Sequence, residues 1–302
     1  MDQLRVGLVG GGPWARTVHA PGLAAHPGTV LAGIWTRRRS AAEELAAEFG
    51  GTVHDSVDDL LDDVDAVAFA VPPDVQATIA VRAAEAGRHL VCDKPLGLTV
   101  AEARAVAEAV AAAGVCSTLM LTMRFEPAVR DWLAGIPDAG PDTVGSAQWL
   151  SGALLGGRYA TSPWRAEHGA LLDVGPHVID LLDAALGTVT GVEWAHYDEP
   201  DLWRFGLRHD GGSRSTASVS LRLPIDPSEV TVTVLGGAGR HRFPGRPGDV
   251  AACYVRLLDE FVAAVRGDGP PPAHDAARGL HLQEIIEAVR AEAARGEPAP
   301  LP

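Results

Sequence analysis

Short apolar segments alternate with amphipathic segments along residues 4–119, and this alternation limits the possible folds more than any other feature of the sequence. The apolar segments are typical of strands buried on both faces, and the amphipathic segments have the spacing of helices. Strands joined in this way run parallel, because a parallel pair requires a crossover connection. The expected strands read LRVGLV, TVLAGIWT, VDAVAFAV, RHLVCD and VCSTLML, and the expected helices cover residues 14–25, 40–49, 74–86 and 100–113. The pattern predicts a doubly wound α/β domain over residues 1–120.

A glycine-rich turn joins the first expected strand to the first expected helix. The segment GLVGGGPWA contains Gly10-x-Gly12-x-x-Ala15 at the start of a βαβ unit, which is the context of a Rossmann dinucleotide site. Gly10 would permit the tight turn, Gly12 would let the backbone approach a pyrophosphate, and Ala15 would let the helix pack closely on the sheet. Pro13 and Trp14 complete the turn that we expect to face the cofactor. The alternative, that the glycines only turn the chain, is less favoured in this context.

The end of the second expected strand bears on the choice between NAD and NADP. No acidic residue occurs between Thr29 and Ser40, where NAD enzymes place a carboxylate on the ribose hydroxyls. Thr36, Arg37 and Arg38 instead offer a hydroxyl and two guanidinium groups, which suit a 2′-phosphate. The sequence therefore favours NADP as the cofactor, with NAD as the alternative.

The chain contains a single lysine, Lys94, although it has 25 lysine and arginine residues together. Lys94 follows the expected strand RHLVC between Asp93 and Pro95, at the edge of the sheet where α/β folds bind ligands, so we expect Asp93 and Lys94 to contact the cofactor. Val71 and Pro72 end the neighbouring strand and are expected to border the same cleft. An ammonium group can release a proton, whereas a guanidinium group stays charged. We therefore interpret Lys94 as a residue chosen for its chemistry, and chance survival of one codon is the alternative.

Several segments, in order, resemble the glucose-fructose oxidoreductase, inositol dehydrogenase and rhizopine-catabolism (Gfo/Idh/MocA) family. They read VGLVGGGPWA, AEAGRHLVCDKPLGLTVAEA, MRFEPAVR and ALLDVGPHVIDLLDAALG, and GLHLQEIIEAVRAEAARGEPAPL is similar to the closing helix of the family. The family's Glu-Lys-Pro motif occurs here as Asp93-Lys94-Pro95. The resemblance implies an NAD(P)-dependent oxidoreductase acting on a sugar, cyclitol or related compound. It also implies that Lys94 lies beside the nicotinamide and the reacting hydroxyl or carbonyl of the substrate.

The segment LLDVGPHVIDLLDAALG contains the second group of candidate catalytic residues. Pro176 can begin a helix with one apolar face, and Gly187 can end it. From the residues alone, Asp173 could be a helix cap and His177 an interior histidine. The resemblance implies instead that His177 is the general acid/base and that Asp173 orients or tunes the site. An imidazole can exchange a proton near neutral pH, and Lys94 would stabilise the developing alkoxide charge.

The second half of the chain has a different pattern. The segments VGSAQWLSGAL, VEWAHY, LWRFGLRH, SRSTASVSLRL and EVTVTVLG are typical of strands, and HDGGS predicts a hairpin between two of them. Helices are expected at residues 176–186, 254–266 and 279–294. We expect an α+β substrate-binding domain over residues 121–302, with a predominantly antiparallel sheet and a C-terminal helix that packs back on the first domain.

Departures from the family pattern fall in segments that should shape the substrate pocket. Gln76 stands where the family often has histidine, and the approach to the Asp-x-Gly-x-His segment is short. Arg124 in TMRFEP matches a family arginine and either holds the fold or binds a polar substrate. Tyr159, Trp164 and Arg165 are further candidates for the pocket lining, although these residue types more often have packing roles. Substrate identity is therefore the least constrained property.

Composition limits the partners and the location. The formal net charge of −14 argues against a nucleic-acid or anionic-membrane partner, because both need a concentrated basic surface. Cys92, Cys116 and Cys253 are too widely spaced for a zinc or disulfide motif, so we expect no metal site and a reducing, cytoplasmic location. No apolar segment approaches the length of a membrane span. The resemblance implies a homo-oligomer, either a dimer or a tetramer.

Two other functions are compatible with the sequence. One is a catalytically inactive, NADP-binding sensor or regulator that kept the fold. The other is an NAD-dependent glycosidase or lyase, in which transient oxidation leaves no net redox change.

Overall fold

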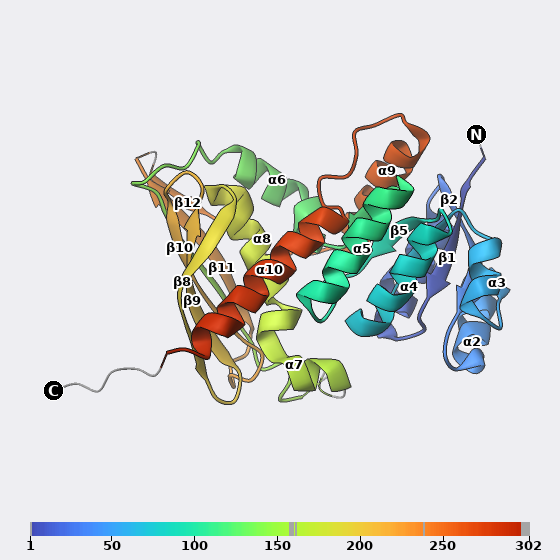
Figure 1. Cartoon of the computed structure of the whole chain (residues 1–302), viewed down its shortest axis with the longest axis horizontal. Coiled ribbons are helices and arrows are strands. Elements are labelled where there is room, and N and C mark those ends of the chain that lie inside the picture. Colours follow the sequence, from blue (N-terminus) through green and yellow to red (C-terminus); the bar gives the residue numbers. More distant parts are fainter. Residues whose placement is uncertain (1, 157–159, 161, 238, 297–302) are drawn as a thin grey trace. The chain divides into compact units, whose positions relative to one another are not determined.

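The structure is a computed structural model that describes residues 2–156, 160, 162–237 and 239–296 (Figure 1). The chain divides into two compact units. The first comprises Met1–Phe125 and Pro247–His281, and the second comprises Glu126–Arg246 and Leu282–Pro302. Residues 247–281 thus belong to the first unit, whereas the sequence placed them in a second domain over residues 121–302. In the part of the chain that the structure describes, no helix is long and apolar enough to cross a membrane.

The first unit is built on a parallel six-stranded sheet with the strand order β3-β2-β1-β4-β5-β6. Its strands are β1 (Leu4–Val9), β2 (Thr29–Trp35), β3 (Thr52–Val53), β4 (Ala66–Phe69), β5 (His89–Cys92) and β6 (Ser117–Leu119). The strand order reverses beside β1, which is the Rossmann arrangement and places ligands at the carboxyl ends of the strands near this point. The predicted doubly wound α/β fold is confirmed.

The connections of this sheet are helical. They are η1 (Ala15–His19, a π-helix), α1 (Ala20–Ala25), α2 (Arg39–Phe49), α3 (Val57–Asp62), α4 (Pro73–Glu85), α5 (Val100–Ala113) and η2 (Thr122–Phe125). Val6 and Leu8 of β1 are fully buried in one core with residues of α1 and α2. Gly7 faces the other side of the sheet, where a Cβ would lie 2.9 Å from Leu60 of α3. Figure 1 shows α4 and α5 packed side by side.

Helix α9 (Val250–Arg266) belongs to the first unit because its apolar face completes that core. Asp249 caps the helix by accepting the N–H of Ala252 at 2.9 Å. The fully buried Tyr254 places its hydroxyl 3.0 Å from Nδ1 of His19, and burial lowers the pKa of His19 to about 3, so this imidazole is neutral. The sequence shows the amphipathic pattern of α9. It does not show which core receives the helix, because α9 follows the strands of the second unit along the chain.

The second unit contains a six-stranded sheet with the order β12-β11-β7-β10-β9-β8. Its strands are β7 (Val144–Leu150), β8 (Val189–Asp198), β9 (Leu202–His209), β10 (Arg214–Ser220), β11 (Glu229–Gly236) and β12 (Gly239–Arg242). Strands β7 and β10 are parallel, and the other neighbouring pairs are antiparallel. This sheet is predominantly antiparallel, as predicted, and β9 and β10 form the predicted hairpin.

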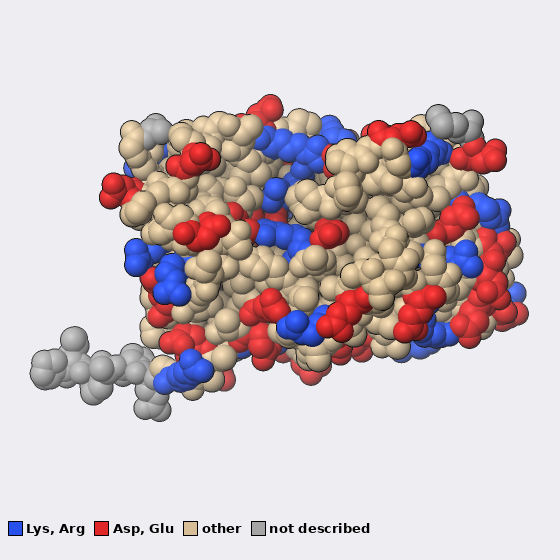
Figure 2. Space-filling view, turned by 45° about the horizontal axis from the view of Figure 1, so that its top comes forward, with Lys and Arg blue, Asp and Glu red and all other residues tan. Residues whose placement is uncertain are grey.

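Helices α6 (Pro127–Ala134), α7 (Pro163–Asp173) and α8 (Gly175–Leu186) belong to the second unit, and α10 (Ala276–Ala293) begins in the first unit and ends in the second. Helix α8 packs on one face of the sheet, where a Cβ at Gly145 would meet Leu182 and Leu186 (Figure 1). Helix α7 was not predicted, because a buried glycine, Gly169, interrupts its helical spacing. On the face drawn in Figure 2, acidic side chains are interspersed with basic ones.

Candidate functional site

The glycine-rich turn follows β1 and adopts a backbone that explains its composition. Gly10 has a φ of 120°, and a Cβ there would overlap the carbonyl oxygen of Ala70, so a side chain is excluded. Gly12 differs, because a Cβ at this position would have nothing within 4 Å. Ala15 is fully buried, which lets the helix pack closely on the sheet. The backbone of Gly12 is therefore open enough for a ligand to approach.

A cavity of about 310 Å³ lies at the carboxyl ends of β1, β2 and β4. The sequence-predicted cofactor residues that line it are Gly10, Gly12, Thr36, Arg37, Arg38, Val71 and Pro72. The sequence did not single out the other lining residues, which are Gly11, Trp35, Ala41, Ala70 and Val75. Most of these residues are next to a predicted residue in the sequence. Their position at the end of a strand could therefore have identified them as lining residues. The cavity matches the place where a doubly wound sheet binds a dinucleotide.

Pro13 and Trp14 are not among the residues that line this cavity. Pro13 is exposed in the first helical turn, and Trp14 is half-buried and packs against the core of the first unit. The indole Nε1 of Trp14 is buried and has no hydrogen-bond partner in the structure. Trp14 therefore contributes packing to the base of the turn.

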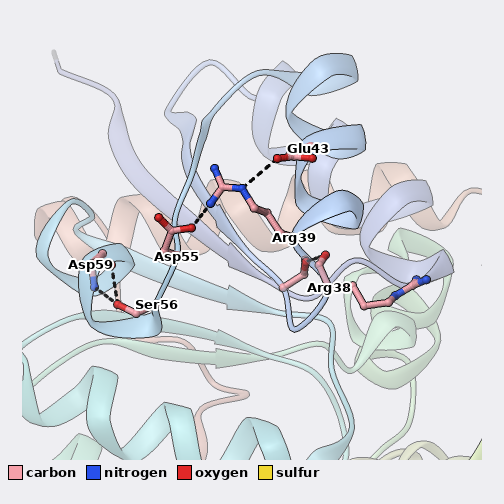
Figure 3. A network of polar contacts seen from close by, with 7 residues as sticks. Arg38, Arg39, Glu43, Asp55, Ser56 and Asp59 are labelled. Atoms are coloured by element: carbon pink, nitrogen blue, oxygen red, sulfur yellow. Dashed lines mark hydrogen bonds and ion pairs between the residues drawn. The ribbon is translucent and has the colours of Figure 1, made fainter.

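The three arginines after β2 differ in their electrostatic surroundings (Figure 3). Arg39 donates to Glu43 at 2.9 Å and also pairs with Asp55, so two carboxylates offset its charge. Arg37 and Arg38 are exposed and line the cavity, and Figure 3 shows the Arg38 side chain pointing away from the Arg39 network. The hydroxyl of Thr36 donates to the carbonyl oxygen of Arg38 at 2.5 Å. The cavity therefore offers an open glycine backbone and two guanidinium groups, which fit an anionic dinucleotide.

Lys94 is half-buried after β5, and the side chain of Gln76 holds the loop that carries it. Gln76 is only 1% exposed. Its Oε1 accepts the N–H of Asp93 at 2.8 Å, and its Nε2 lies 2.8 Å from the carbonyl oxygen of Asp93. The same Nε2 lies 3.2 Å from each of the carbonyl oxygens of Pro95 and Leu96. Gln76 therefore fixes the backbone path on both sides of Lys94.

The sequence noted Gln76 only as a departure from the family pattern in a segment that shapes the pocket. The available signal was a polar residue on the buried face of α4, which requires hydrogen-bond partners. The N–H of Lys94 also donates to Oδ1 of Asp93 at 2.8 Å, and the Lys94–Pro95 peptide bond is cis. Asp93 and Lys94 are not among the residues that line the glycine-turn cavity.

Asp173 and His177 lie at the junction of α7 and α8. Asp173 is the last residue of α7, and its carboxylate lies 3.1 Å from Nε of Arg165. His177 is in the first turn of α8 and is 8% exposed. Its imidazole stacks on the indole of Trp149, with ring centroids 5.6 Å apart and an interplanar angle of 24°. The guanidinium carbon of Arg246 lies 5.0 Å from the centroid of the same indole. The sequence did not single out Trp149 or Arg246.

The structure gives specific surroundings to the predicted substrate residues. Arg165 pairs with Asp173 and lies over the ring of Trp164, with its guanidinium carbon 4.5 Å from the ring centroid. Arg124 is half-buried in η2 of the first unit. Tyr159 lies outside the described residues. Lys94, Arg124 and the cavity belong to the first unit, whereas Asp173, His177 and Arg165 belong to the second. Among the described residues, no group of His, Cys, Asp and Glu side chains could hold a metal ion.

Comparisons with known proteins support the resemblance seen in the sequence. Residues 4–121 match the Gfo/Idh/MocA family, described as an oxidoreductase family with a NAD-binding Rossmann fold. Levoglucosan dehydrogenase from Pseudarthrobacter phenanthrenivorans is 34% identical over 214 residues, which cover 64% of this chain and 53% of the relative. The chain thus spans about half the length of that relative.

Two longer matches extend over nearly the whole chain. Glucose-fructose oxidoreductase domain-containing protein 2 from Mus musculus is 26% identical over 362 aligned residues, which cover 97% of this chain and 92% of the relative. The WlbA dehydrogenase from Bordetella pertussis, solved in complex with NADH and UDP-GlcNAcA, shares the fold with a TM-score of 0.85 and 23% identity over 100% of both chains. Both units therefore occur together in a known fold.

Proposed function

We propose that the chain is an NAD(P)-dependent oxidoreductase, on the premise that residues 4–121 match the Gfo/Idh/MocA oxidoreductase family with its NAD-binding Rossmann fold. It acts on a hydroxyl or carbonyl carbon of a sugar, cyclitol or related small molecule. The observation that carries the proposal is the cavity at the ends of β1, β2 and β4, with its open Gly12 backbone and its two guanidinium groups. The sugar dehydrogenase among the relatives supports the substrate class.

The residues of the chain would handle charge and protons. When bound, the nicotinamide supplies the redox step at the substrate carbon. His177 would accept or donate the proton of the substrate oxygen, and Lys94 would stabilise negative charge on that oxygen. Asp173, held by Arg165 at 3.1 Å, would orient the site as a fixed carboxylate. The stacking of His177 on Trp149 restricts the imidazole ring, which supports a role that depends on orientation.

We propose NADP as the preferred cofactor, because Arg37 and Arg38 line the cavity while Arg39 is paired with two carboxylates. Replacing both Arg37 and Arg38 by alanine is expected to raise the Kd for NADP at least about tenfold, since the 2′-phosphate would lose charge-assisted hydrogen bonds. The Kd for NAD should change by less than about twofold, as NAD lacks this phosphate. Fluorescence titration with each cofactor measures both values.

Arg39→Ala is the matched control for this variant. It removes a neighbouring exposed guanidinium that already has carboxylate partners, so the preference for NADP should persist. An equal loss of NAD and NADP affinity in the double variant would contradict the assignment of the 2′-phosphate site.

The proposed activity is tested by incubating the wild-type protein with NADP or NAD and a panel of sugars, cyclitols and their keto forms. Substrate-dependent change in the absorbance of the reduced nicotinamide is the expected result. Tight cofactor binding without turnover on any panel member would favour a sensor or regulator. Product formation without net absorbance change would favour a glycosidase or lyase cycle, and either outcome would replace the proposed oxidoreductase.

A further inference from the structure

Helix α7 contains a break just before its functional end. Gly169 has φ 64° and ψ −157°, which is not helical, so α7 consists of two helical parts on either side of this residue. The second part carries Asp173 and leads directly into α8, which carries His177. The backbone at Gly169 therefore sets the direction in which the segment with both proposed catalytic residues runs.

Asp201 contacts this break from another part of the second unit. It lies just before β9 and is only 3% exposed. Its Oδ1 accepts the N–H of Ala170 at 2.9 Å, and its Oδ2 accepts the N–H of Leu221 at 2.9 Å. A Cβ at position 169 would overlap the same carboxylate. Asp201 thus caps the second part of α7 and requires glycine at the break.

Arg222 contacts the other side of the break. Its Nη2 donates to the carbonyl oxygen of Ala166 at 3.1 Å, near the end of the first part of α7. A cation suits the C-terminal end of a helical part, and a carboxylate suits the N-terminal end of the next. Burial raises the pKa of Asp201, and the charge of Asp173 acts in the same direction. The two backbone N–H bonds and the charge of Arg222 oppose this shift. The break therefore lies among two carboxylates and two arginines, since Asp173 pairs with Arg165.

The second hydrogen bond of Asp201 links the break to the sheet beneath His177. Leu221 directly follows β10, and Val219 of β10 is the register partner of Trp149 in β7. Trp149 is the residue on which His177 stacks. The same end of the paired strands β7 and β10 thus supports His177 through Trp149 and supports the Asp173 segment through Asp201. The buried carboxylate of Asp201 therefore links the segment that carries Asp173 to the strands that support His177.

We propose that Asp201 is a positioning residue, which fixes the break at Gly169 and so places Asp173 for the reaction. The inference rests on the proposed function. It identifies a residue that touches neither cofactor nor substrate and acts through Asp173. In this role the two carboxylate oxygens of Asp201 are both needed, because each holds a different backbone N–H.

Asp201→Asn tests the inference, because an asparagine of the same size can accept only one of the two N–H groups. We expect kcat to fall on the order of tenfold to a hundredfold, since small displacements of a catalytic group cost about this much. The KM for the cofactor should stay within about twofold. Asp198→Asn is the matched control, because Asp198 is an exposed partner of Arg204 and should leave kcat unchanged.

Two further measurements separate positioning from general stability. In an Asp173→Asn background, adding Asp201→Asn should lower kcat by less than about threefold, because the two changes act on one group. Hydrogen exchange of the amides at residues 170–174 should be at least about tenfold faster in Asp201→Asn than in Asp198→Asn. If Asp201→Asn does not fold, Arg222→Gln is the second variant. It removes the guanidinium that contacts Ala166 and the positive charge that acts on Asp201, and it should lower kcat in the wild-type background but not in Asp173→Asn.

Each outcome is decisive. Faster exchange with unchanged kcat, or the same fold-loss of kcat with and without Asp173, would overturn the positioning role. Unchanged exchange would show that the two hydrogen bonds do not hold the break. Turnover by the wild-type protein is measured before the variants are compared. Absence of any nicotinamide-dependent turnover would refute the proposed function itself.

Discussion

Lys94→Arg is expected to lower kcat by about a hundredfold to a thousandfold, although it preserves the positive charge. A guanidinium group is wider than an ammonium group, so it would misplace the charge that stabilises the substrate oxygen. It also cannot release a proton. Cofactor affinity should survive, because the cavity at the glycine turn is lined by other residues. The loop should also keep its path, since Gln76 holds it through backbone atoms and not through the lysine side chain.

Steady-state kinetics at saturating cofactor and a fluorescence titration of NADP binding measure the two expectations separately. Arg82→Lys is a suitable control, because it makes the reverse exchange at an exposed position on α4, where Arg82 pairs with Asp58. Wild-type turnover by Lys94→Arg would remove the main reason for assigning chemistry to this residue. Loss of cofactor affinity together with turnover would instead indicate that the substitution disturbs the first unit.

The features that the sequence predicted well are those set by local pattern. The glycine turn was predictable because Gly10 needs a positive φ and closely approaches Ala70, and such positions select glycine directly. The positions at which β1, β2 and β4 end were predictable because each apolar segment stops after a few residues. The carboxyl ends of parallel strands lie at one edge of the sheet. The position of Thr36, Arg37 and Arg38 at this edge, where they line the cavity, was therefore predictable from the sequence.

The features that the sequence did not reveal depend on contacts between distant segments. Gln76 holds residues 17 to 20 positions away, and Asp201 holds an amide 31 positions away. Neither distance follows from any periodicity. A polar side chain at a buried position signals that partners exist but does not identify them. The ion pair between Arg165 and Asp173 was likewise not predicted, and the role of Arg165 in substrate binding stays a prediction.

The unit that receives α9 is a third example. The amphipathic pattern of a helix indicates that one face will be buried, but it does not indicate which hydrophobic core of the protein that face packs against. In this chain the stripe with Tyr254 and Phe261 completes the core beneath β1, far from it in sequence. The choice depends on contacts of α9 with η1, α1, η2 and β6, which local pattern does not encode.

His177→Asn is expected to lower kcat by about a hundredfold to ten-thousandfold, which is the range attributed to general acid–base catalysis. Asparagine is smaller and polar but does not exchange protons near neutral pH, so the variant removes the proton transfer at the substrate oxygen. The fold should persist, because the helix is held to the sheet by other residues such as Leu182 and Leu186 against Gly145. Cofactor affinity should change by less than about twofold, since His177 is not among the cavity residues.

His196→Asn provides the matched control for this prediction. His196 also lies beside a tryptophan, Trp194, with ring centroids 5.7 Å apart, but it is on β8 and carries no proposed chemistry. The two variants therefore remove the same side chain from beside an indole, which is buried at Trp149 and exposed at Trp194, and only His177→Asn should lose turnover. If both variants lose turnover equally, the effect comes from the lost histidine–tryptophan packing, because that is the feature they share. If neither loses it, the proton acceptor of the reaction is another group, and the role of Asp173 beside it must be reassigned as well.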